Sequence, residues 1–188
     1  EHEIAEILPL CLEAGAENIE LHAAVPGDDT IIKEWEIVNK AQPHHFVSMC
    51  LDRLHLSDFA LTTRIKKAID ISGERFIVQA DGVPMSGGKD DFNTTLQAVA
   101  IADVIRKNLL TKKSGYGKIH ILLSGGTNGK TGELAKLCDI PFSGVSIGTH
   151  ARKLVQEYIN NDRFETDLEL VKNAVYIARD LVSRSLEP

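Results

Sequence analysis

The stretch KIHILLSGGTNGKT, from Lys118 to Thr131, decides the fold class of this 188-residue chain. Its segment 119–123 is short and mostly apolar, as in a strand that is covered on both faces. Glycine and hydroxyl residues follow, and a helical pattern then begins. After one short helix, FSGVSIGTHARK, from Phe142 to Lys153, repeats the same order of strand, polar loop and helix. Successive units of this kind predict an α/β fold with a parallel sheet.

The same order of strand and helix recurs along the rest of the chain. Apolar periodicity, helix caps and Gly or Pro breaks delimit the elements. Strict alternation of strands with helices implies right-handed crossovers. We expect strands at 18–23, 46–51, 75–80, 119–123 and 145–147. We expect a first helix at 4–14. A second helix is capped by Asp28 or Asp29 and ends before Pro43, and a third is capped by Ser57 or Asp58 and ends at Gly73. Further helices are expected from 90–93 to 110, around 134–137, at 151–159 and at 167–185.

Two architectures fit five β/α units. One is the C-terminal five units of a TIM-like barrel whose first strands lie upstream, and the other is an open doubly wound sheet. A complete barrel takes about 250 residues, which is more than this chain has. The chain also opens on a helix that feeds a strand. We therefore expect residues 1–188 to form a single β/α domain, the C-terminal portion of a larger barrel.

Composition and charge exclude several classes of protein. The net charge is −6, and the basic residues are scattered, so we expect no nucleic-acid partner. No apolar run approaches the roughly 20 residues that span a bilayer. Cys11, Cys50 and Cys138 are widely spaced and odd in number, which predicts buried apolar thiols without disulfides. A reducing compartment such as the cytoplasm fits this pattern.

Ligands of parallel sheets bind at the carboxyl ends of the strands, which makes the loop after residue 123 a candidate site. The sequence from Ser124 to Thr131 resembles a P-loop, but its glycine spacing is one residue short. We therefore do not expect a nucleoside triphosphate. The backbone N–H groups of this loop suit an anion, although a plain glycine turn fits equally well. The candidate residues are Gly125, Gly126, Thr127 and Asn128.

The next strand end offers a second set of candidate residues. Gly148 allows a ligand to approach the backbone closely. Thr149 either contacts that ligand or caps the following helix. Arg152 lies one turn into the helix, where its guanidinium group either reaches a phosphate or is solvated.

Acid–base candidates lie at two other strand ends. Asp81 follows a strand directly and is a candidate acid or base, or else only stabilises its Asp-Gly turn. His22 is a second candidate, or else a structural histidine. Asp52 and Arg53 pair with each other or with a neighbour. We find no second histidine or carboxylate with metal-ligand spacing to His22, and we expect no metal ligands in this chain.

Read together, these motifs resemble the C-terminal part of the light-dependent period protein of cyanobacteria and their plastid-bearing relatives. The resemblance rests on QADGVPMSGG, LSGGTN and SIGTHARK, and LEAGAENIELHAA, FVSMCLDRL and DDFNTTLQA also fit. It covers nearly the whole chain. The positions that match are Asp81, Gly82, Pro84, Met85, Ser86, Gly87, Gly125, Gly126, Thr127, Asn128, Gly148 and Arg152.

The resemblance implies a barrel-like fold with a ferredoxin-type iron–sulfur segment upstream, and a role in sensing redox state and tuning the circadian period. The cysteine-rich segment is absent here, so we expect a cluster only upstream and no cofactor in this chain. We predict a regulatory module that binds a small anionic or quinone-like ligand. The alternatives are a TIM-barrel enzyme acting on a phosphorylated or carboxylated metabolite, with Asp81 or His22 as acid–base, and a scaffold that packs on the upstream segment. The predicted ligand-binding residues are Asp81, Gly82, Ser86, Gly87, Gly125, Gly126, Thr127, Asn128, Gly148, Thr149 and Arg152.

Overall fold

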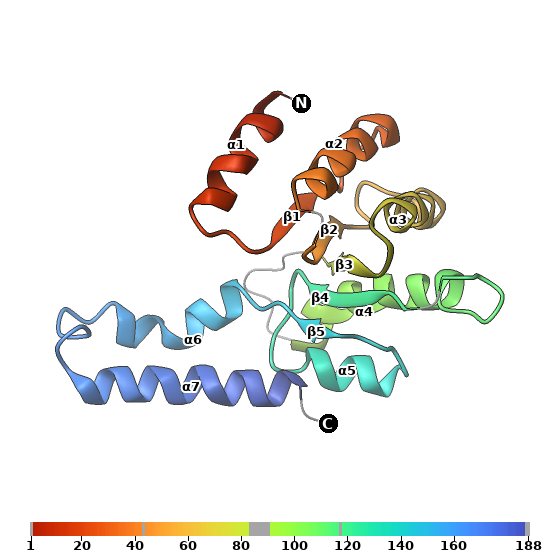
Figure 1. Cartoon of the computed structure of the whole chain (residues 1–188). Coiled ribbons are helices and arrows are strands. Elements are labelled where there is room, and N and C mark those ends of the chain that lie inside the picture. Colours follow the sequence, from red (N-terminus) through yellow and green to blue (C-terminus); the bar gives the residue numbers. More distant parts are fainter. Residues whose placement is uncertain (1, 43, 83–90, 117, 187–188) are drawn as a thin grey trace.

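A computed structural model describes residues 2–42, 44–82, 91–116 and 118–186 of the chain. Within these residues, parallel strands form one open sheet in the order β1-β2-β3-β4-β5 (Figure 1). The predicted α/β class and parallel pairing are therefore confirmed. The strands are β1 (Ile19–His22), β2 (Val47–Leu51), β3 (Phe76–Asp81), β4 (His120–Ser124) and β5 (Gly144–Val145).

The helices follow the predicted order, with shifts at their ends. The strand β5 is shorter than expected and ends before Ile147, and α6 begins at Thr149 instead of Ala151. No helix in the described part of the chain is both long and apolar enough to cross a membrane. The helices are α1 (His2–Glu13), α2 (Asp28–Ala41), α3 (Asp58–Ser72), the 3₁₀ turn η1 (Gly73–Arg75), α4 (Asp91–Leu109), α5 (Thr131–Leu137), α6 (Thr149–Ile159) and α7 (Leu168–Leu186).

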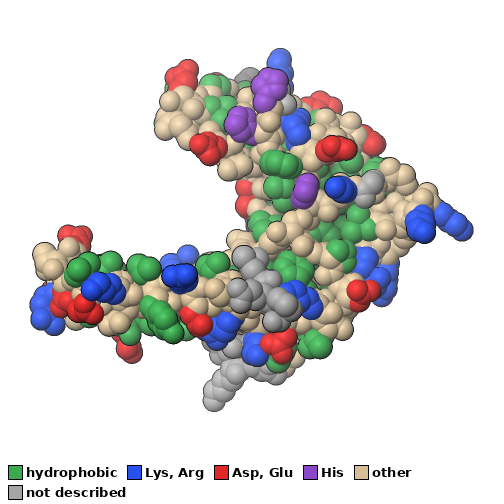
Figure 2. Space-filling view, turned by 60° about the horizontal axis from the view of Figure 1, so that its bottom comes forward, with side chains coloured by type: hydrophobic (Ala, Val, Ile, Leu, Met, Phe, Trp, Pro, Cys, Tyr) green, Lys and Arg blue, Asp and Glu red, His purple; other side chains and the backbone are tan. Residues whose placement is uncertain are grey.

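The strand order is sequential, without the reversal that defines a doubly wound sheet. Right-handed crossovers between sequential parallel strands place the connecting helices on one face of the sheet. In Figure 1, α2, α3 and α4 lie along one side of the strands, whereas α1 and the α6–α7 pair flank the other side without closing it. The result is a C-shaped molecule, and the same hollow outline is visible in the space-filling view (Figure 2).

The core lies between the sheet and the helices that cover it. Trp35 of α2 is fully buried, and its ring meets Phe76 edge to face at 5.8 Å. Its indole N–H donates to the Ala68 carbonyl at 3.2 Å and to Ser72 Oγ at 2.9 Å, so the polar atom is satisfied. The buried apolar strand residues on this side are Val47, Met49, Leu51, Phe76, Val78, Ala80, Ile121 and Leu123.

A buried arginine joins the end of β1 to α3. Arg64 donates from Nε and Nη2 to Asp28 Oδ1 at 3.0 and 2.7 Å, and from Nη1 to the carbonyls of Ala23 and Val25. Burial alone would raise the pKa of Asp28, but the hydrogen bonds and charge of Arg64, with those of Lys67, hold it below its usual value. The prediction that Asp28 or Asp29 caps α2 is wrong, because Gly27 is the N-cap and no side chain caps this helix.

Candidate functional site

One face of the sheet carries polar side chains from three neighbouring strands. Successive strand residues point to opposite faces, so residues two apart share a face. His22 of β1, Cys50 of β2 and Gln79 of β3 are register partners. They lie on the face opposite to the buried apolar residues, together with Glu20 and Ser48. We call this side of β1 to β3, with Asp81, the polar face.

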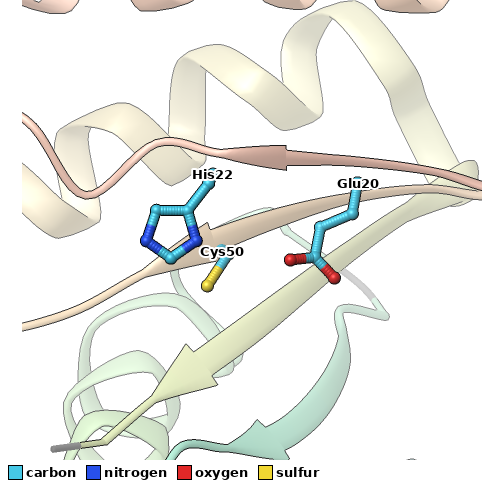
Figure 3. A group of neighbouring side chains, drawn as sticks. All are labelled: Glu20, His22 and Cys50. Carbon is cyan, nitrogen blue, oxygen red and sulfur yellow. The ribbon is translucent and has the colours of Figure 1, made fainter.

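Glu20, His22 and Cys50 form a close group within the polar face. Figure 3 shows their side chains projecting from the same side of β1 and β2. A carboxylate oxygen, a ring nitrogen and the sulfur of the three residues all lie within 4.8 Å of one another. The side-chain amide of Gln79 donates to the Glu20 carboxylate and, at 3.3 Å, to Ser48 Oγ.

The chemistry of Cys50 is set by its surroundings. Burial raises the pKa of its thiol far above the ordinary value, and the carboxylates of Asp81, Glu20 and Asp52 raise it further. A thiol rather than a thiolate is a poor nucleophile. Of the three cysteines that we expected to be buried, only Cys50 is; the expectation is wrong for Cys11 and Cys138, which are exposed.

A cleft of about 360 Å³ lies at the carboxyl ends of β2 and β3. Its cationic lining residue, Arg53, is paired with Asp58, with Nε and Oδ1 2.8 Å apart. Asp52 instead accepts from the backbone N–H groups of Leu54 and His55. Asp52 and Arg53 were predicted to pair with each other or with a neighbour, and the second alternative is confirmed: each interacts with a neighbouring residue. The described lining is Arg53, Leu54, Asp81, Gly82, Gln97 and Ile101.

Gly82 and Gly125 serve the packing of two strand ends against each other. The backbone N–H of Gly82 donates to the Ser124 carbonyl at 2.8 Å. Gly125 has a φ of 68°, in the region that favours glycine, and an added Cβ would overlap Asp81 Oδ1 and lie 2.5 Å from the Gly82 carbonyl oxygen. The structure therefore brings Asp81, Gly82 and Gly125 together through contacts between the backbones of the two strand ends.

Thr127 and Asn128 tie the loop after β4 to its neighbours. Thr127 Oγ1 donates to the Ser146 carbonyl after β5. Asn128 is buried, its side-chain amide donates to Thr94 Oγ1 at 2.8 Å, and its backbone N–H donates to Thr131 Oγ1 at 2.9 Å. These hydrogen bonds join the loop to other parts of the protein, which matches the alternative of a plain glycine turn for residues 124–131.

The start of α6 gathers three of the predicted residues. Gly148 is the N-cap, so Thr149 is the first helical residue and not the cap. Arg152 Nη2 donates to Thr149 Oγ1 at 3.1 Å, and an added Cβ on Gly148 would lie 3.7 Å from Arg152 Nη1. All three residues are exposed. Gly126, in the loop after β4, is half-buried and has a φ of 72°. The remaining two predicted ligand-binding residues, Ser86 and Gly87, lie outside the described residues, as do Pro84 and Met85.

Sequence reasoning missed Glu20 and Cys50 as possible site residues. The statement that no carboxylate has metal-ligand spacing to His22 is wrong, because Glu20 lies two residues before it on the same face. That signal was present in the alternation of the strand. The contribution of Cys50 depends on the pairing of β1 with β2, which no local pattern specifies.

The cysteines of this chain do not fit an iron–sulfur cluster. Such clusters are held by four thiolates, or by two with two histidines in a Rieske centre. This chain has three cysteines, and they lie on α1, on β2 and after α5. The neighbours of Cys50 with ligand atoms close to its sulfur are the imidazole of His22 and the carboxylates of Glu20 and Asp81.

Comparison with known proteins gives one result. The family model of the light dependent period A C-terminal domain matches residues 10–184, nearly the whole chain. Neither a curated protein nor a solved structure matches this chain. The match agrees with the resemblance found in the sequence motifs.

Proposed function

The chain belongs to the light dependent period A C-terminal domain family, and we propose that it is the ligand-binding module of an iron–sulfur, redox-responsive protein that tunes the circadian period. The family implies a role in light-dependent period regulation. The observation that carries the finer proposal is the polar face, which the described helices leave open (Figure 1). Parallel sheets are normally covered on both faces. This face is therefore suited to receive another part of the same protein.

The partner in this proposal is an upstream segment that carries the cluster and completes a TIM-like barrel. The sequential strand order is the order of a barrel. The edges of the described sheet are β1 and β5, and an edge strand presents backbone N–H and C=O groups for pairing. A change at the cluster would then reach this module through strands that share its sheet.

The small anionic ligand is assigned to the start of α6. Backbone N–H groups of a first helical turn attract anions, and Gly148 leaves them without a side-chain cap. The guanidinium group of Arg152 adds positive charge beside Gly148. The bond from Thr127 to Ser146 holds the loop with Gly125 and Gly126 next to this strand end.

Titration with inorganic phosphate, followed by amide NMR shifts, tests the anion site. We expect saturable shifts at residues 148–152 in the wild-type chain and their loss in Arg152→Ala. The matched control is Arg163→Ala, which removes an exposed arginine between α6 and α7 and should leave the shifts intact. Shifts that persist in Arg152→Ala, or that scatter over several helix starts, would remove the anion site from the proposal.

Comparison of the intact protein with this chain tests the module itself. We expect iron–sulfur absorbance in the intact protein and none in the chain alone. Amide hydrogens of β1 should exchange more slowly in the intact protein, because new strand pairing protects them. A cluster bound by this chain, or equal exchange of β1 in both forms, would contradict the proposal.

A period measurement tests the physiological role. In a photosynthetic host with a luminescent clock reporter, Arg152→Ala should shift the light-dependent period towards that of a strain lacking the protein. Arg163→Ala should keep the wild-type period. A wild-type period in both variants would separate the anion site from period control.

A barrel enzyme acting on a phosphorylated or carboxylated metabolite is the second candidate. One observation favours it: Asp81 and Arg53 line the same cleft, so a carboxylate that could act as acid or base lies in one pocket with a cationic side chain. Thermal-shift measurements against such metabolites would support it if a hit is lost in Asp81→Asn. Without a hit, the regulatory proposal stands alone.

The proposed location is the cytoplasm, or the plastid stroma in a photosynthetic eukaryote. The three cysteines are free, and Cys11 and Cys138 are exposed. Exposed thiols persist in compartments where thioredoxin and glutathione keep them reduced.

A further inference from the structure

The geometry of the polar face points to a binding site for a zinc ion, and we infer that Glu20, His22 and Cys50 are its protein ligands. This inference does not rest on the proposed function. It uses three residues that neither the anion site nor the cleft uses.

The three ligands come from two paired strands, which fixes their spacing. His22 and Cys50 are register partners on β1 and β2, and Glu20 shares the face of His22. Their donor atoms lie within 4.8 Å of one another. Tetrahedral zinc with bonds of about 2.0–2.3 Å would hold them roughly 3.3–3.8 Å apart. In Figure 3 the sulfur of Cys50 lies between the imidazole and the carboxylate, so we expect side-chain rotation to supply this closure.

The donor set selects zinc over harder cations. Thiolate and imidazole suit zinc, whereas calcium and magnesium prefer oxygen ligands. On binding, Cys50 releases its thiol proton to solvent and bonds through the thiolate. One thiolate, one carboxylate and one neutral imidazole balance the charge of a divalent ion. Three protein ligands leave a fourth position open for water or another ligand.

Gln79 acts as a positioning residue for this site. Its buried side-chain amide donates to the Glu20 carboxylate, which leaves the other carboxylate oxygen for the metal. A second bond to Ser48 Oγ, at 3.3 Å, fixes the amide itself. Groups that hold a metal ligand in place typically change metal affinity by about 10–100-fold when removed.

The test is a zinc titration of the tag-free 188-residue chain in competition with a chromophoric chelator. We expect a single zinc ion per chain. Glu20→Gln and His22→Asn should each weaken binding by roughly 100-fold or more, beyond the effect of a positioning residue. Both side chains are exposed, so these variants should fold as the wild type does, which circular dichroism checks.

Cobalt substitution identifies the thiolate. Cobalt bound by the wild-type chain should show a near-ultraviolet thiolate-to-metal band and the visible bands of a tetrahedral site. Cys50→Ser should lose the thiolate band, whereas Cys138→Ser should keep it. Gln79→Leu should keep the band and bind zinc about 10–100-fold more weakly.

Two controls separate this site from adventitious binding. His120→Asn removes a histidine from β4, outside the group, and should leave zinc affinity unchanged. Magnesium should not compete. Absence of zinc binding, wild-type zinc affinity in Glu20→Gln or His22→Asn, or a thiolate band that survives in Cys50→Ser would each overturn the inference.

Discussion

The two faces of the sheet are built by the same strands and differ in chemistry. On the helix-covered face, Val47, Met49 and Val78 are fully buried against the helices. On the polar face, Glu20 and His22 are exposed, and Cys50 and Gln79 are buried among polar neighbours. The covered face supplies apolar burial, which is the main driving force of folding. The polar face contributes little apolar burial and carries the groups that can bind a ligand or metal.

Stability and chemistry are divided between the two faces of each strand. Because side chains alternate, a single strand such as β2 delivers Met49 to the core and Ser48 and Cys50 to the other face. Substitutions on the covered face should therefore cost stability, and those on the polar face should change reactivity or binding.

The largest expected effect comes from the buried arginine at the end of β1. Arg64→Met removes the partner of Asp28 and leaves the carbonyls of Ala23 and Val25 without their donor. Breaking a buried ion pair costs about 3–5 kcal/mol of unfolding free energy. Arg53→Met, which breaks the exposed pair with Asp58, should cost roughly 0–1 kcal/mol. Urea denaturation measures both, and equal losses would contradict the distinction.

Two adjacent residues of β2 compare the faces directly. Met49→Ala leaves a cavity in the covered core and should lower the unfolding free energy by about 2–5 kcal/mol. Ser48→Ala on the polar face removes two long hydrogen bonds, to the Ile19 carbonyl at 3.5 Å and from the Gln79 amide at 3.3 Å, and should cost about 1 kcal/mol or less. Urea denaturation of the pair sharpens the comparison, and a costlier Ser48→Ala would break it.

The junction of the strand ends gives an intermediate effect. Gly125→Ala introduces a Cβ at a φ of 68° against Asp81 and the Gly82 carbonyl. Overpacking of this kind costs about 1–3 kcal/mol. Gly115→Ala is the matched control, since Gly115 has a φ of 76° and nothing within 4 Å of the added Cβ. Thermal melts should show the larger loss for Gly125→Ala; equal losses would mean that only the backbone conformation matters.

The smallest effect on stability is expected at Cys50. In the metal-free chain, a thiol reagent at mildly alkaline pH should modify Cys11 and Cys138 quickly and Cys50 slowly, because Cys50 is buried and its pKa is raised. A raised pKa favours the protonated thiol in the folded state. Stability from this group is therefore complete below the unfolded pKa, about 8.5, and declines as the pH rises above it.

The control for this prediction is Cys50→Ala, which should lose the slow phase of modification and the alkaline decline. A fast phase that includes Cys50 in the folded wild-type chain would contradict the assignment of a protonated, buried thiol.

Local patterns predicted the order of elements because each helix and strand depends on nearby residues. Ser57 or Asp58, for example, was expected to cap α3, and Ser57 is its N-cap: its Oγ accepts from the Ala60 N–H at 3.2 Å. Asp28 or Asp29 was expected to cap α2 by the same logic, but Gly27 is the N-cap, and Asp28 pairs with Arg64, which is 36 residues away in the chain. No local pattern contains this partner.

The β/α alternation, the family and the glycine-bearing strand ends could be predicted from the amino-acid sequence, because apolar periodicity, turn residues and motif spacing are local properties. The sequential strand order, the polar face and the grouping of Cys50 with Glu20 and His22 became visible only in the folded chain. These depend on which strands pair and in which register. A parallel register brings together residues that are far apart in the chain, and the close group at β1 and β2 exists only once that register is set.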